Sequence, residues 1–191
     1  MSPALALLLA GAAAVFGLLW PDYDQWLPGL EHRSVLTHGL WLPLGLAFAA
    51  RRTAWLAPVA AGAALGIAVH CAPDLFPAAM QGYALIKLPF VADFGAGLSW
   101  AWLAATVVLG IVVPLRWVEA RFGATGLGIA AAAAEVLALA YFVLHDEPPA
   151  MALGVGGALA LAHPAARSQL LARARRVTLA RLLAARHRSE S

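Results

Sequence analysis

The strongest constraint in this sequence is a series of long apolar stretches with almost no charge inside them. There are six, and they run approximately over Pro3–Trp20, Val35–Ala50, Ala54–Ala72, Gly95–Leu115, Thr125–Leu144 and Pro149–His163. The chain is 62% hydrophobic and only 12% charged, whereas soluble domains are about 45–50% apolar and about 25% charged. Disordered chains are excluded as well, because they require low hydrophobicity. The sequence therefore predicts an all-α, polytopic transmembrane helix bundle with about six spans.

We expect a single domain with a short appendage. Residues 1–163 are predicted to form the transmembrane bundle, with polar segments at 20–39 and 66–83. Residues 164–191 carry seven arginines and one acid, and we expect them to form a helical tail in the cytoplasm. Met1–Leu9 has no Lys or Arg, so the first apolar stretch is interpreted as an uncleaved span and not as a signal peptide.

The positions of the basic residues predict the orientation. With the N-terminus in the cytoplasm, six spans place eleven of the thirteen basic residues on the cytoplasmic side, including Arg51, Arg52, Arg116 and Arg121. Most of the acids then face outward. This pattern predicts an N-in/C-in, multi-pass protein, and the Arg- and Ala-rich composition suggests a bacterial gene.

Two polar segments, Trp20–Gly39 and Gly66–Tyr83, are predicted to lie at the same outer face. Together they supply six side chains that can bind a metal ion, namely Asp22, Asp24, His32, His38, His70 and Asp74. Carboxylates and imidazoles without a thiolate suit Zn, Mn or Fe(II). We expect His32 in the loop, His38 in the first turns of the second span, and His70 and Asp74 on one helix face unless Pro73 ends that helix.

Other polar residues allow more than one interpretation. Arg33 with Thr37 or Ser34 is predicted to bind an anionic oxygen, because the planar guanidinium matches phosphate geometry. A lone His at the end of a span is more often a hydrogen-bonded structural residue, and His145 is interpreted in this way. Glu135, in the middle of the fifth apolar stretch, is either a functional carboxyl or a protonated group between helices.

The order of these motifs resembles a known family. Pro-Asp-x-Asp at 21–24 is followed by His-Arg-x-x-x-Thr-His at 32–38, His-x-x-x-Asp at 70–74, and a segment from Gly82 to Phe90. This order resembles the YdjM-like (DUF457) family of bacterial inner-membrane proteins, described as metal-dependent hydrolases and distantly similar to the zinc phospholipase C / P1 nuclease group. The resemblance implies metal ligation by all six side chains named above. Gln25 stands where many members have His, so we expect one or two ions.

The leading hypothesis is a membrane-embedded hydrolase at the periplasmic face, acting on a phosphate ester such as a lipid head group. A divalent metal, Zn with Mn or Fe as alternatives, activates water in this hypothesis. Arg33 stabilises charge with Ser34 or Thr37, and Asp24 or Glu31 is the general base. The alternatives are a non-catalytic membrane subunit with a structural metal clamp and a pigment- or haem-binding protein using His38 and His70. We expect membrane lipid, a membrane protein or a second copy as partners, and no nucleic acid.

Overall fold

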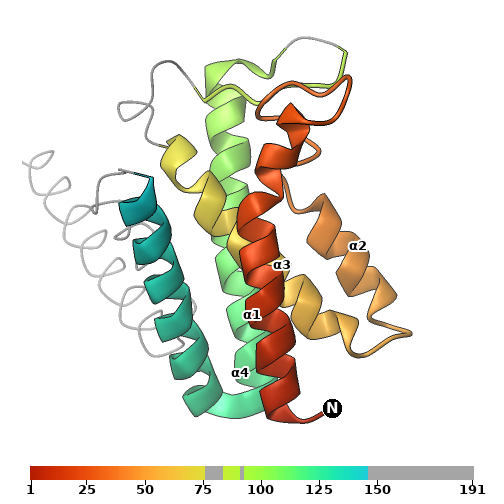
Figure 1. Ribbon diagram of the computed structural model, residues 1–191, viewed down its shortest axis with the longest axis vertical. Coiled ribbons are helices and arrows are strands. Elements are labelled where there is room, and N and C mark those ends of the chain that lie inside the picture. The colour runs from red at the N-terminus through yellow and green to blue at the C-terminus, as the bar shows by residue number, and fades with distance from the viewer. Residues whose placement is uncertain (76–83, 91–92, 146–191) are drawn as a thin grey trace, which may run out of the picture.

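The protein is all-α, as the sequence predicts, in a computed structural model that describes residues 1–75, 84–90 and 93–145. The chain runs up and down between two ends of an elongated bundle (Figure 1). The element order is α1 (Pro3–Leu19), the short 3-10 helix η1 (Pro21–Gln25), α2 (Trp41–Ala49), α3 (Leu56–Cys71), the 3-10 helix η2 (Pro73–Leu75) and α4 (Gly95–Leu144).

Helix α4 reverses direction part-way along its length. A straight helix of its 50 residues would be about 75 Å long. Instead, Gly123 adopts φ 70° and ψ −170°, and the chain turns back on itself there, so α4 has a first arm before Gly123 and a second arm after it (Figure 1). Near the start of α4, Trp102 Nε1 donates a hydrogen bond to the His38 carbonyl over 2.7 Å, and near its end Tyr141 Oη lies 3.0 Å from His70 Nδ1. Both ends of α4 therefore lie at the same end of the bundle.

The closest helix pair is α1 against α3, and small residues allow it. Gly62 and Gly66 of α3 pack against the α1 backbone at Ala10 and Ala14, and a Cβ atom at either glycine would collide with a carbonyl oxygen there. Gly17 makes the reciprocal approach from α1 onto Ala63. Small residues at such positions let two backbones approach closely, which maximises van der Waals contact where water is absent.

The prediction of a six-span bundle is wrong. The described residues form four α-helices, of which only α4 is long and apolar enough to cross a membrane, while α1 and α3 are shorter apolar helices. The second apolar stretch fails as a span because residues 35–40 form a loop, leaving α2 only nine residues. The fourth and fifth stretches belong to one helical element, α4. The sixth stretch and the tail at 164–191 lie outside the described residues, and the N-in/C-in topology, which depended on six spans, is withdrawn.

The loop at 35–40 is held by contacts that a span would not make. The Val35 N–H donates to the Lys87 carbonyl over 2.8 Å, and the Lys87 N–H donates to the Arg33 carbonyl over 2.9 Å. Arg33 itself adopts a left-handed backbone conformation with φ 67°, which is uncommon outside glycine. The polar segment thus replaces helical hydrogen bonds with a bridge to residues 84–90.

The α1–α3 contact gives a stability prediction. Gly62→Ala is expected to destabilise the protein by about 1–3 kcal/mol, because the added methyl group forces the helices apart. The matched change Gly11→Ala places its methyl group where no other atom lies within 4 Å, so it should leave stability unchanged or raise it slightly. Thermal unfolding of both variants in detergent, followed by circular dichroism, checks this; equal midpoints would contradict the close packing.

Candidate metal centre

The site lies at the end of the bundle where α1, α3 and both ends of α4 meet. Asp22 and Asp24 lie on η1, directly after α1. His32 and His38 come from the loop that precedes α2, so His38 is not in a helical turn as the sequence suggested. His70 lies in the last turn of α3. The helix ends at Cys71 and η2 carries Asp74, so Pro73 does interrupt the helix.

Asp24 is the most buried acid of the site. One of its oxygens, Oδ2, accepts a hydrogen bond from the Ser34 N–H over 2.9 Å and another from the Thr37 hydroxyl over 2.8 Å. His38 Nδ1 lies 3.3 Å from the same oxygen, and His32 Nδ1 lies 3.5 Å from Oδ1. A buried carboxylate needs such partners, because losing its hydration is costly.

These contacts set the charge state of the pair Asp24 and His32. Burial alone would raise the pKa of Asp24, but the His32 and His38 rings, the Ser34 N–H and the Thr37 hydroxyl together hold that pKa well below its ordinary value. The contact with Asp24 raises the pKa of His32 in return, against the effect of its partial burial. Asp24 is therefore ionised at neutral pH.

Two ligand atoms in this group are buried and lack a hydrogen-bond partner among the described residues. They are Asp24 Oδ1 and His38 Nε2. Because a carboxylate only accepts hydrogen bonds, the proton of His38 belongs on Nδ1, which leaves a lone pair on Nε2. One ligand atom from each of Asp24, His32 and His38 lies within 4.8 Å of the others. The group could therefore hold a metal ion, and the orphaned atoms fit that use.

The other three predicted ligands adjoin this group. His38 Nε2 lies 3.9 Å from Asp74 Oδ2, and His70 Nε2 lies 3.9 Å from Asp22 Oδ1. The His38 and His70 rings are 5.5 Å apart between centroids. His70 Nδ1 donates to the Leu18 carbonyl over 2.8 Å, which again leaves Nε2 with the lone pair. The structure thus brings all six predicted ligands to one place, although their role as ligands stays a prediction.

The predicted catalytic and substrate-binding residues differ in their burial and in their contacts with the ligand cluster. Arg33 Nε donates to Asp74 Oδ1 over 3.2 Å, beside the ligand cluster. Ser34 and Thr37 are almost fully buried and are engaged with Asp24. Glu31 is exposed and its carboxylate lies 3.6 Å from Lys87 Nζ. Their roles in a reaction stay predictions. Arg33 contacts Asp74, which lines a polar cavity.

This polar cavity, of about 230 Å³, opens onto the cluster. Its lining residues are Asp22, His32, His70, Pro73, Asp74, Tyr141 and His145. Tyr141 was not among the residues predicted from the sequence, and His145 was interpreted as a structural residue. His145 Nδ1 does lie 2.8 Å from the Tyr141 carbonyl oxygen, yet the ring also forms part of the cavity wall. Glu135 lies apart on the second arm of α4, and both interpretations of its carboxyl group remain open.

The chain was compared with family models, with curated proteins and with solved structures. None matches. The resemblance to the YdjM-like family therefore stays a prediction from the motifs, and the function has to be argued from the geometry of the site.

The burial of Asp24 gives a prediction for acid stability. Because the folded-state pKa of Asp24 lies below its ordinary value of 3.8, the ionised group stabilises the fold above about pH 4 and this contribution disappears as the pH falls further. Asp24→Asn should therefore lower stability at pH 7 by about 2–4 kcal/mol, with a smaller difference from the wild type at pH 3. Denaturant unfolding at both pH values measures this. An undiminished difference at pH 3 would contradict it.

Proposed function

We propose that this protein is a membrane-bound, metal-dependent hydrolase that acts on a phosphate ester, such as a lipid head group, at the periplasmic face of a bacterial inner membrane. The observation that carries the proposal is that two buried ligand atoms, Asp24 Oδ1 and His38 Nε2, make no hydrogen bond within the described part of the chain. Leaving such atoms without a partner is costly, and a cation between them removes that cost. The motif order of the sequence supports the same function.

The residues that would hold the ion are Asp24, His32 and His38, with Asp22, His70 and Asp74 close enough to contribute or to hold a second ion. Nitrogen and oxygen ligands of this kind favour Zn, with Mn and Fe(II) as alternatives. When bound, such an ion supplies a Lewis acid and lowers the pKa of a coordinated water molecule. The hydrogen bonds of His38 and His70 through Nδ1 keep both rings oriented for this task.

The surroundings of the cluster suit an anionic substrate. The polar cavity beside the ligands is about 230 Å³ in volume and has a tyrosine and a histidine on its wall, Tyr141 and His145. Arg33 adds a fixed positive charge next to Asp74, which favours binding of phosphate oxygens. Asp24 has one oxygen fully engaged and a lowered pKa, so we assign it to holding the ion and not to proton transfer.

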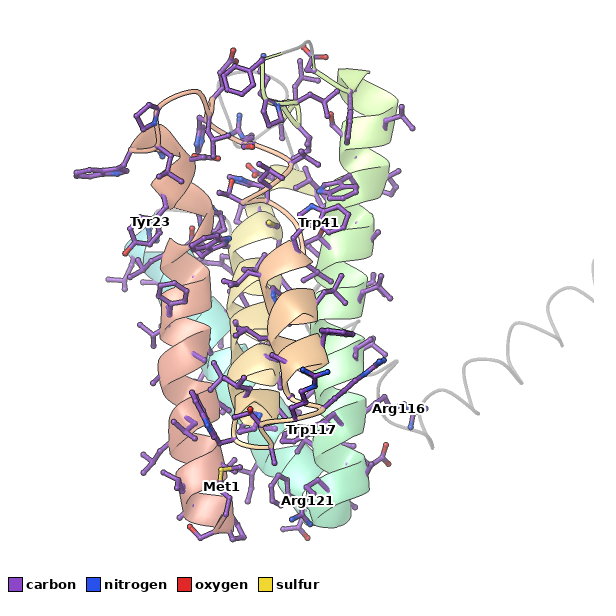
Figure 2. All side chains as sticks on the ribbon, turned by 90° about the vertical axis from the view of Figure 1, so that its right-hand side faces the viewer. Met1, Tyr23, Trp41, Arg116, Trp117 and Arg121 are labelled. Atoms are coloured by element: carbon purple, nitrogen blue, oxygen red, sulfur yellow. The ribbon has the colours of Figure 1, made fainter. Side chains whose placement is uncertain are left out.

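A membrane location is supported by the apolar surface. Helix α4 could span a bilayer, and only 22% of its most apolar window is buried in the protein. Aromatic side chains occur towards both ends of the bundle, with Tyr23 and Trp41 nearer the site and Trp117 nearer the opposite end (Figure 2), as is typical of the two membrane interfaces. Arg116 and Arg121 also lie near the end opposite the site (Figure 2), and the preference of Arg for the cytoplasmic side supports an outward-facing site.

Metal binding and hydrolysis by the purified full chain test the proposal. The wild type should retain zinc, and Asp22→Asn and His38→Gln should each weaken zinc binding by about 100-fold, because each loses a ligand atom. Hydrolysis of phosphatidic acid or of an aryl phosphate should fall to background in the same variants. Elemental analysis, an absorption spectrum and phosphate release are the measurements.

Glu119→Gln is the matched control, because Glu119 pairs with Arg116 over 2.8 Å and lies on the first arm of α4 far along the chain from every predicted ligand. It should keep both zinc and activity. Zinc retained without hydrolysis of any phosphate ester would favour the non-catalytic subunit instead, and a Soret band would favour haem. Unchanged zinc binding in His38→Gln would remove the basis of the proposal.

A further inference from the structure

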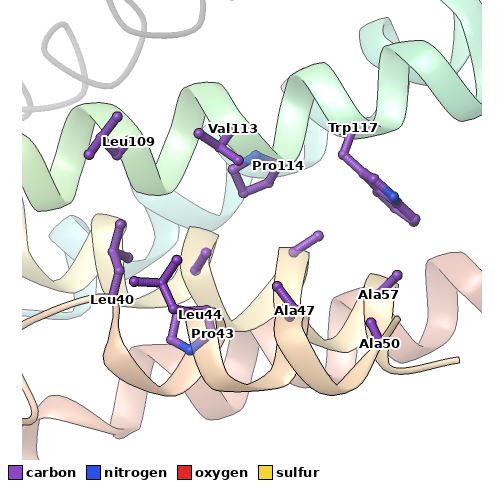
Figure 3. Close-up of a pocket in the computed structure, with 13 residues that line it drawn as sticks. Leu40, Pro43, Leu44, Ala47, Ala50, Ala57, Leu109, Val113, Pro114 and Trp117 are labelled. Carbon is purple, nitrogen blue, oxygen red and sulfur yellow. The ribbon is translucent and has the colours of Figure 1, made fainter. Parts of the chain in front are cut away.

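A second cavity, unrelated to the polar site, lies between α2, α3 and the first arm of α4. It is a groove of about 340 Å³ lined by side chains that are all apolar. Leu40 lies at one end, and Ala50, Ala57 and Trp117 lie towards the other (Figure 3). Alanines of α2 and α3 face larger side chains of α4 across it. The groove falls in the size range of small-molecule sites and offers a ligand almost no hydrogen bonds.

The end of the groove marked by Ala50 and Trp117 is strongly basic. Arg51 and Arg52 follow Ala50 directly in the turn between α2 and α3, and Arg116 precedes Trp117. The Arg51 guanidinium lies over the Phe48 ring at 5.2 Å from its centroid, which keeps it beside α2. Among the described residues, Arg116 pairs with Glu119, whereas neither Arg51 nor Arg52 forms a salt bridge.

An apolar groove with a cationic mouth is complementary to one class of molecule, an amphiphile with an anionic head group. Basic pockets between helices at the cytoplasmic side of a membrane bind the head groups of anionic lipids in this way. A soluble apolar ligand would leave the arginines unused, and a soluble anion would leave the groove unused. The two features together therefore select a phospholipid over either alone.

We propose that this groove binds an anionic phospholipid of the bilayer, with an acyl chain between α2, α3 and α4 and its phosphate at Arg51 and Arg52. The groove is open to the surface along α2, whose Leu44 and Phe48 are exposed, so a lipid can enter it sideways from the bilayer. The basic mouth of the groove lies at the end of the bundle opposite the metal cluster, and Leu40 lies at the other end of the groove. The head group of the bound lipid is therefore not the substrate of the proposed hydrolase, and this inference does not depend on that function.

The test uses the full chain in a mild detergent, with phosphatidylglycerol and phosphatidylcholine of identical acyl chains as probes and native mass spectrometry to count bound lipid. The wild type should bind phosphatidylglycerol about tenfold more tightly than phosphatidylcholine, as expected for two arginines near a screened surface. The double variant Arg51→Gln, Arg52→Gln should lose this preference. The control variant Lys87→Gln, which removes a positive charge at the opposite end of the bundle, should keep the preference for phosphatidylglycerol.

Filling the groove separates this site from lipid bound elsewhere on the surface. Ala61→Phe, or the milder Ala61→Leu if the first variant fails to fold, should reduce binding of both lipids, whereas Ala12→Phe on the exposed side of α1 should not. Equal affinity of the wild type for the two lipids would overturn the proposal. Unchanged lipid binding in both Ala61 variants would also overturn it. So would a dimer that Ala61→Leu disrupts and that added lipid does not dissociate, because a second copy of the chain would then occupy the groove.

Discussion

The carboxylate of Asp24 lies in the interior at the end of η1, where the Ser34 N–H, the Thr37 hydroxyl and two histidine rings surround it. A charge in this position is tolerated only while those partners stay in place. The segment that supplies them has little regular structure of its own, so the requirement of one buried charge orders the loop before α2. The same contacts bring His32 and His38 close to Asp24 and to each other, and the three side chains therefore form a candidate ligand set.

The sequence predicted part of this arrangement well. Its low charge and high apolar content indicated an all-α protein, and the clustering of acids and histidines in two short segments indicated one polar site. Both segments do meet, because α1 and α3 are parallel neighbours, held together by Gly17, Gly62 and Gly66, whose C-terminal ends lie at the same level. The spacing of these residues along the chain was sufficient to predict one site, since each polar segment lies at the end of a well-formed helix.

The rest could not be obtained from composition. Hydropathy cannot distinguish Val35–Leu40 from the start of a membrane span, because the hydrogen bonds that hold it as a loop come from Lys87, far along the chain, and from the side chain of Asp24 on η1. The reversal at Gly123 depends on a single positive φ angle. That reversal returns Tyr141 to within 3.0 Å of His70, across 71 residues of sequence, and nothing in the sequence near Tyr141 signals its place in the cavity wall.

The hydrogen bond between His70 and the Leu18 carbonyl has a consequence for the chain's maturation. The last turn of α1 supplies the acceptor that fixes the tautomer of a predicted ligand on α3, and η1, with both acidic candidates, begins directly beyond that helix. Proteolytic removal of the N-terminal helix would therefore remove the carbonyl that holds the His70 ring and the helix that positions Asp22 and Asp24. The first helix thus belongs to the architecture of the site.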